Sequence, residues 1–148
     1  YIILASLFGL SFSILLSIFK ESFTGIISDQ NKFIKIIPHS LLRNFPINKK
    51  ADWEDGVSLI LRQNMGSGIN FIPITKNYPK ELDELIKIFN NSKKETKITL
   101  AKSISDINIL FINILVVYPN KISEEDIFII NQDLSNSETN TLGWIYLY

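Results

Sequence analysis

The sequence has no cysteine and only one histidine, His39, among its 148 residues. Without thiols there is no disulfide, no zinc site built on cysteine and no thiol nucleophile. A single histidine leaves at most one candidate for a Ser-His-Asp relay or a histidine metal site, and the short sequence PHS around it offers no catalytic partner. We therefore interpret His39 as an ordinary loop or surface residue.

An excess of charge is also lacking, because Lys+Arg and Asp+Glu both total 15. No basic field attracts nucleic acid, so we expect no nucleic-acid partner. A phosphate loop, GxxxxGK[ST], is absent as well. The glycine pair in residues 65–70 (MGSGIN) precedes a predicted strand and does not stand between a strand and a helix, so we interpret it as a turn.

A long uncharged run opens the chain, from Ile2 to Phe19. About 20 apolar residues cross a hydrocarbon core of about 30 Å, so we expect a membrane-spanning helix over residues 1–20. The run has no basic segment or cleavage site, and we expect the tail of a longer protein instead of a signal peptide. Small residues recur every four positions and form a stripe where another helix can pack, unless they make no contact at all. This stripe consists of Ala5, Gly9, Ser13 and Ser17.

Basic residues gather after this run, and such an excess marks the cytoplasmic side of a membrane span. They are Lys20, Lys32, Lys35, Arg43, Lys49 and Lys50. We expect an inner (plasma) membrane protein with membrane lipid as a partner and a cytoplasmic C-terminal domain.

A connector is predicted over residues 21–50. Ser28 is suited to cap a short helix, and Pro38 stops it. An apolar cluster follows, and the polar stretch at residues 48–50 marks the expected boundary with the next domain.

Residues 51–148 alternate between helix and strand patterns, which predicts an α/β domain with a small, mainly parallel, Rossmann-like sheet flanked by helices. Trp53 and Trp144 are expected in or near its core. The expected helices begin at Asp52, Pro79 and Ser123, and the expected strands cover residues 69–74, 96–102, 111–118 and 141–148.

Three neighbouring carboxylates, Glu124, Glu125 and Asp126, raise the question of a metal site. Acidic residues in a first helical turn are favoured by the helix dipole, and the alternating ligands of a calcium loop are missing. We therefore expect a capping role for this cluster, with no metal, no cofactor and no catalytic residue.

The order of these segments resembles the C-terminal part of bacterial polysaccharide co-polymerases, the chain-length determinant proteins. In that family a membrane helix is followed by a motif that is similar to residues of the connector here. The final stretch, with VVYPNKIS and TLGWIYLY, is similar to the end of the kinase-like cytoplasmic domain that many members carry. The matching connector residues are Gly25, Ile27, Ser28, Pro38, Leu41 and Pro46.

The resemblance implies a membrane anchor and kinase-like domain that act in exopolysaccharide or lipopolysaccharide biosynthesis and export. It implies a homo-oligomer that contacts polysaccharide polymerase or export components. The phosphate-loop lysine and the metal-holding aspartates are missing, so we expect a non-catalytic domain that works through assembly. Two alternatives stay open, an ATP-binding tyrosine autokinase with a degenerate phosphate loop and a generic membrane-anchored α/β interaction domain.

Overall fold

The computed structural model describes residues 2–63, 68–75, 77–92, 95–137 and 139–148, and in the first helix it describes the side chains of residues 6, 8–16, 18 and 19. The described helices are α1 (Ile2–Thr24), α2 (Gln30–Ile36), α3 (Trp53–Gln63), α4 (Glu81–Ser92) and α5 (Glu124–Asn136), with 3-10 helices η1 (Ile47–Asp52) and η2 (Ile104–Asp106). The described strands are β1 (Ile26–Ile27), β2 (Leu41–Phe45), β3 (Gly68–Pro73), β4 (Lys97–Leu100), β5 (Ile112–Val117), β6 (Ile122–Ser123) and β7 (Thr141–Leu147).

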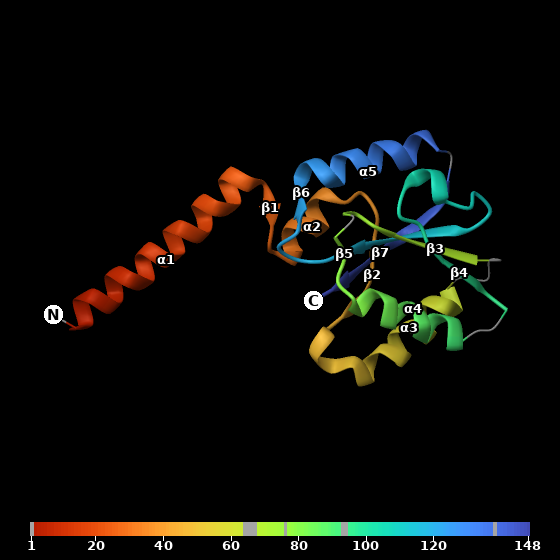
Figure 1. The fold of residues 1–148 in the computed structure, drawn as a ribbon, viewed down its shortest axis with the longest axis horizontal. Helices are drawn as coiled ribbons and strands as arrows, with labels where there is room; N and C mark the ends of the chain where they lie inside the picture. The colour runs from red at the N-terminus through yellow and green to blue at the C-terminus, as the bar shows by residue number, and fades with distance from the viewer. Residues whose placement is uncertain (1, 64–67, 76, 93–94, 138) are drawn as a thin grey trace.

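A five-stranded parallel sheet with the order β2-β7-β5-β3-β4 forms the centre of the domain. Helices α2 and α5 lie on one side of this sheet, and α3 and α4 lie on the other (Figure 1). The central strand β5 is buried from Asn113 to Val117, because helices cover both of its faces. The prediction of an α/β domain with a parallel sheet between helices is confirmed.

The two tryptophans lie in the core, and each is 1% exposed. A buried indole N–H needs an acceptor. Trp53 Nε1 donates to the Pro46 carbonyl at 2.9 Å, and Trp144 Nε1 donates to the His39 carbonyl at 2.9 Å. These two hydrogen bonds connect the residues on either side of β2 to the core of the domain.

The segment before residue 51 contributes the edge strand β2, which pairs in parallel with β7. Gly143 of β7 makes this pairing possible, because a Cβ there would lie 2.4 Å from the Ser40 carbonyl oxygen. Helix α2 ends at Ile36, just before Pro38, as predicted. Its cap is a correction: the side chain of Asp29, and not that of Ser28, accepts a hydrogen bond from the Asn31 N–H.

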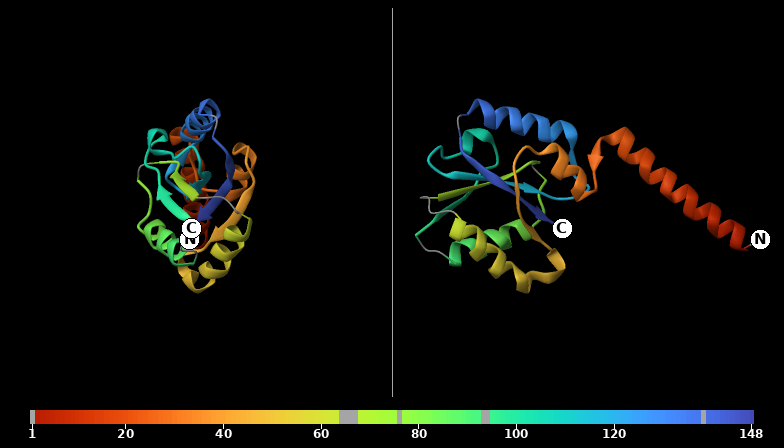
Figure 2. Two further views of the ribbon diagram at one scale, coloured as in Figure 1. Left: turned by 90° about the vertical axis from the view of Figure 1, so that its right-hand side faces the viewer. Right: turned by 180° about the vertical axis from the view of Figure 1, so that it is seen from behind.

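Helix α1 extends away from the domain, as Figure 1 and the right-hand view of Figure 2 show. The prediction that residues 1–20 cross a membrane is corrected here: within the described part of the chain, no helix combines the length and the apolar character that a crossing requires.

A second, two-stranded sheet joins the base of α1 to the segment that precedes α5. Strand β1 pairs antiparallel with β6, with Ile27 opposite Ile122. The Asn120 N–H donates to the Ile27 carbonyl at 3.0 Å, and Lys32 Nζ lies 3.0 Å from a carboxylate oxygen of Glu124. We call this arrangement the β1–β6 clamp.

Candidate functional site

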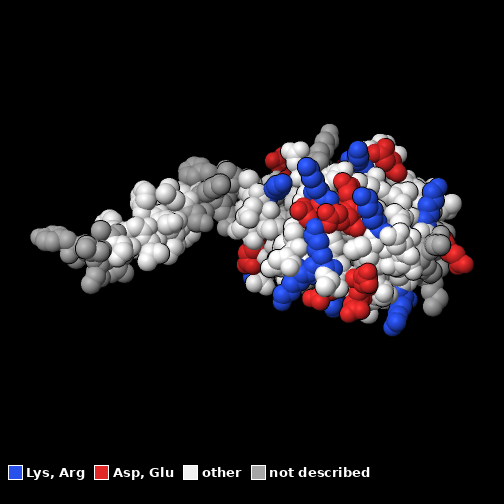
Figure 3. Space-filling view, turned by 60° about the horizontal axis from the view of Figure 1, so that its bottom comes forward, with Lys and Arg blue, Asp and Glu red and all other residues white. Residues whose placement is uncertain are grey.

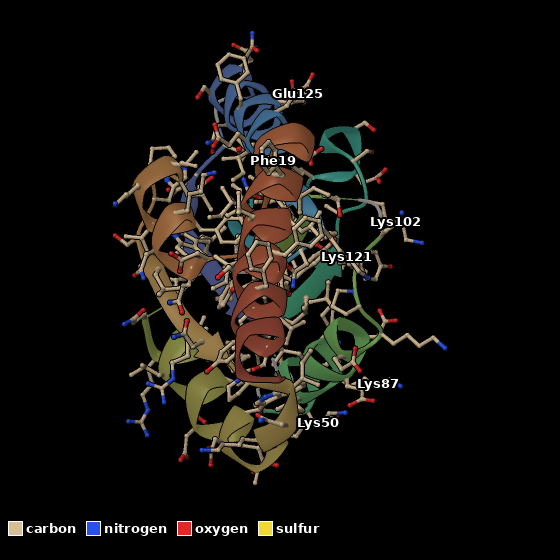
Figure 4. All side chains as sticks on the ribbon, turned by 90° about the vertical axis from the view of Figure 1, so that its left-hand side faces the viewer. Phe19, Lys50, Lys87, Lys102, Lys121 and Glu125 are labelled. Carbon is tan, nitrogen blue, oxygen red and sulfur yellow. The ribbon has the colours of Figure 1, made fainter. Side chains whose placement is uncertain are left out.

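The connections of the sheet change direction between β3 and β5. From β3 the chain continues to β4 at one edge, whereas from β5 it continues to β7 on the opposite side. In open α/β sheets, ligands bind outside the carboxyl ends of the strands at such a point. The candidate site is therefore the carboxyl edge around β3 and β5, which faces the viewer in Figure 4.

The connection from β3 to α4, residues 74–80, stands where a phosphate loop would be expected. It contains no glycine, so its backbone lacks the residues that normally let N–H groups converge on a phosphate. The first turn of α4 holds three carboxylates, on Glu81, Asp83 and Glu84. Negative side chains occupy the positive end of the helix dipole and oppose an anion there. This connection is not built to hold a triphosphate.

A tyrosine and a threonine link the two strands at this edge. The hydroxyl groups of Thr75 and Tyr118 lie 2.5 Å apart, and the Tyr118 hydroxyl also donates to the Thr75 carbonyl at 3.1 Å. Burial raises the pKa of Tyr118, which is 3% exposed. The neutral phenol is therefore favoured, and the pair acts as a structural bridge between the ends of β3 and β5.

Two cavities are lined by residues that follow β3 at this edge and by residues of neighbouring segments. The first, the α5 hollow, has a volume of about 580 Å³ and is lined by Thr75, Asn77, Lys121 and Asp126. The second, the η2 hollow, has a volume of about 380 Å³ and is lined by Pro73, Tyr78, Lys102, Ser103 and Asp106. Each contains one lysine and one aspartate.

Asp126 is held in place by the predicted capping box. Its Oδ2 accepts hydrogen bonds from the Ser123 N–H at 2.8 Å and from Ser123 Oγ at 2.7 Å, and its own N–H donates to Ser123 Oγ. The capping role expected for the 124–126 cluster is thus present in the structure. Among the described residues no group of acidic or histidine side chains is arranged to hold a metal ion.

The predicted packing stripe on α1 is described only in part. Gly9 and Ser13 are exposed, and a Cβ at Gly9 would have no atom within 4 Å. The side chains of Ala5 and Ser17 lie outside the described ones. The glycine pair at residues 65–68 also lies outside the described residues, except for Gly68 at the start of β3.

The predicted connector motif does not form a site. Gly25 has a left-handed backbone with φ of 62° between α1 and β1, and Ser28 is exposed. Pro38 follows α2, Leu41 begins β2, and the Pro46 carbonyl accepts the Trp53 hydrogen bond. These residues shape the chain between α1 and the sheet.

Sequence reasoning missed the residues of the α5 hollow. Thr75 and Asn77 belong to no motif, Lys121 was considered only as part of the VVYPNKIS stretch, and Asp126 was assigned only to capping. The sequence did contain a signal for this site. These residues follow the predicted ends of two strands, and the ends of parallel strands lie at one edge of a sheet, where ligands bind. Comparison with family models, curated proteins and solved structures finds no match for this chain.

Proposed function

We propose that this chain is a non-catalytic α/β module that acts through assembly, as the resemblance to polysaccharide chain-length determinants implies. The observation that carries the proposal is α1, which extends from the domain and exposes large apolar side chains among its described residues. These are Phe8, Leu10, Phe12, Ile14, Leu15, Leu16, Ile18 and Phe19, each at least 51% exposed. A helix that is apolar on all sides is stable when other groups cover it.

The exposed side chains of α1 provide apolar area for an interface. The three phenylalanines, each more than half exposed, can bury about 300–400 Å² between them, and the five leucine and isoleucine side chains add to this area. A standard interface buries about 800 Å² per partner. Since these side chains surround the helix, we expect α1 to contact more than one neighbouring helix.

The charge distribution favours association through α1. Residues 2–19 of α1 carry no charge in the sequence, whereas Figure 3 shows charges of both signs mixed over the domain. Charge repulsion between these residues therefore does not oppose the approach of a second copy, and the mixed surface of the domain gives no strong attraction of its own. We infer a homo-oligomer assembled through α1.

The absence of catalysis is supported by the carboxyl edge of the sheet. Phosphoryl transfer needs donors and a metal that stabilise the transferring charge. The connection at residues 74–80 has no glycine that would let backbone N–H groups converge on a phosphate. The three carboxylates at the start of α4 repel a phosphate. The predicted contacts with membrane lipid and with polysaccharide export components, and the predicted inner-membrane location, stay predictions.

Sedimentation of the full chain tests assembly. In the isolated chain a side chain at position 9 meets open space, so Gly9→Leu leaves the fold intact but obstructs a closely packed neighbour. We expect wild type to sediment as an oligomer and Gly9→Leu to shift toward monomer by about tenfold in dissociation constant, equivalent to about 1.4 kcal/mol. The matched control, Ile34→Phe, enlarges an exposed side chain on α2, outside the proposed interface, and should leave the oligomer unchanged. A monomeric wild type would overturn the proposal.

A further inference from the structure

Helix α5 exposes two large apolar side chains that are adjacent in the sequence. Phe128 is 68% exposed and Ile129 is 48% exposed, whereas Ile127 on the inner side of the helix is buried in the core. Figure 4 shows Glu125, one turn before Ile129, on the side of α5 that points away from the sheet. We call Glu125, Phe128, Ile129 and Asp133 the outer face of α5.

The charges of α5 are all negative, since the helix contains no lysine or arginine. The helix dipole accounts for the carboxylates in the first turn, but Asp133 lies in the last turn, where the dipole disfavours a negative charge. Glu125 and Asp133 are exposed, and neither forms an ion pair with a described residue. Within the described part of the chain, nothing offsets the charge of Asp133.

The two carboxylates lie on either side of the apolar pair along one row of the helix. Glu125 precedes Ile129 by four residues and Asp133 follows it by four, so these side chains are neighbours on the helix surface. A lysine four residues after Glu125 would stabilise an exposed helix, but that position holds Ile129. At about 1.5 Å per residue, the two carboxylates are about 12 Å apart along the axis.

We propose that the outer face of α5 docks an amphipathic helix of another protein, which carries two lysine or arginine residues about two turns apart with apolar residues between them. The apolar centre of the partner covers Phe128 and Ile129, and its basic ends pair with Glu125 and Asp133. The proposal does not depend on assembly through α1.

A second copy of this chain offers no such helix among its described elements. Helix α2 is 7 residues long, and its two lysines are separated by a single turn. Helices α1, α3 and α4 each contain one lysine or arginine. An anionic membrane surface would be repelled by the carboxylates of α5. The charge of the outer face therefore favours a basic helix of a different protein.

Fluorescence anisotropy tests the proposal with the full chain and a labelled amphipathic peptide, LKKLLKLLKKLLKL, as the probe. We expect saturable binding with a dissociation constant of about 10 μM, and no saturation with LEELLELLEELLEL, which keeps the apolar face but reverses the charge. Phe128→Gln should weaken binding about tenfold, because it removes the largest apolar contact. Glu125→Gln combined with Asp133→Asn should weaken it about threefold, since exposed ion pairs contribute modestly.

The matched controls are Leu59→Gln and Asp83→Asn, which change an exposed apolar and an exposed acidic side chain on α3 and α4, on the other side of the sheet. Both should leave the affinity unchanged. All the substituted side chains are exposed, so the variants should stay folded, and circular dichroism checks this.

Three outcomes would overturn the proposal. The first is an absence of saturable binding, or equal binding of the glutamate peptide. The second is an equal loss of affinity in Phe128→Gln and Leu59→Gln, as expected if the peptide binds elsewhere, for example on α1. The third is dissociation of the wild-type oligomer by Phe128→Gln in sedimentation, which would assign the outer face to a second copy.

Discussion

Asn70 and Asn113 form a polar pair in the centre of the sheet, and both are 0% exposed. Asn70 Nδ2 donates to Asn113 Oδ1 and to the Asn108 carbonyl, both at 2.9 Å, and Asn70 Oδ1 accepts from Thr99 Oγ1 at 2.6 Å. Asn113 Nδ2 is buried without a partner among the described residues. The two side chains are chemically identical but differ in how fully they are paired, and their substitutions should therefore differ in cost.

Asn70→Ala removes three hydrogen bonds, which at about 1 kcal/mol each lowers the free energy of unfolding by about 3 kcal/mol before any cavity cost. Asn113→Ala removes one of these bonds but also a buried unpaired donor, whose burial costs about 1–3 kcal/mol. Both substitutions delete the same atoms from fully buried positions, so the cavity costs largely cancel. We predict that Asn70→Ala is more destabilising than Asn113→Ala by about 2 kcal/mol or more.

Urea unfolding followed by the fluorescence of the two buried tryptophans measures both values. The double variant completes a cycle that isolates the coupling between the two asparagines, expected at about 1 kcal/mol. Equal costs, or a larger cost for Asn113→Ala, would refute the assigned pairing of the amide groups.

Three further predictions concern the β2 edge of the sheet and the cap of α5. Gly143→Ala places a Cβ against the Ser40 carbonyl, so we expect a loss of about 1–3 kcal/mol in the free energy of unfolding, measured by urea titration. Ser123→Ala removes the α5 cap and should cost about 1 kcal/mol in the same assay, whereas Ser123→Thr should restore most of it. Burial lowers the pKa of His39 below 6.5, so its contribution to stability is full above pH 6.5 and falls as the pH drops. Accordingly, His39→Gln should reduce the slope of unfolding free energy against pH below pH 6.5, and an unchanged slope would contradict the assignment.

Strong local signals in the sequence predicted several elements of the domain. The apolar run at residues 111–118 became the central strand β5, since such a run is stable only between two helical layers. The SEED sequence became the capping box of α5, because its side-chain bonds depend on a spacing of three residues. Both signals lie within a few residues of the structure they determine.

The edge strand β2 could not be predicted in the same way. Its sequence, LLRNF, does not alternate, and it lies between two prolines. It becomes a strand because it pairs with residues that are distant in the sequence. Gly143 leaves room for the Ser40 carbonyl, which accepts a hydrogen bond from the Trp144 N–H at 3.0 Å. Contacts over such a separation leave no local pattern.

The candidate site could not be predicted from the sequence for a related reason. Lys121 and Asn77 are single polar residues in turns, and only the strand order brings them to one edge of the sheet. The sequence could predict which chemistry was missing, since a phosphate loop is a contiguous motif. It could not predict which of many surface polar groups share one hollow.

The central claim, that this domain does not use ATP, is tested most directly by titrating the full chain with ATP and magnesium and measuring the heat of binding. We predict no saturable heat at concentrations up to about 1 mM, because residues 74–80 contain no glycine and the first turn of α4 carries three carboxylates. Saturable binding with a dissociation constant of about 1 μM, from a sample whose fold is confirmed by circular dichroism, would contradict it.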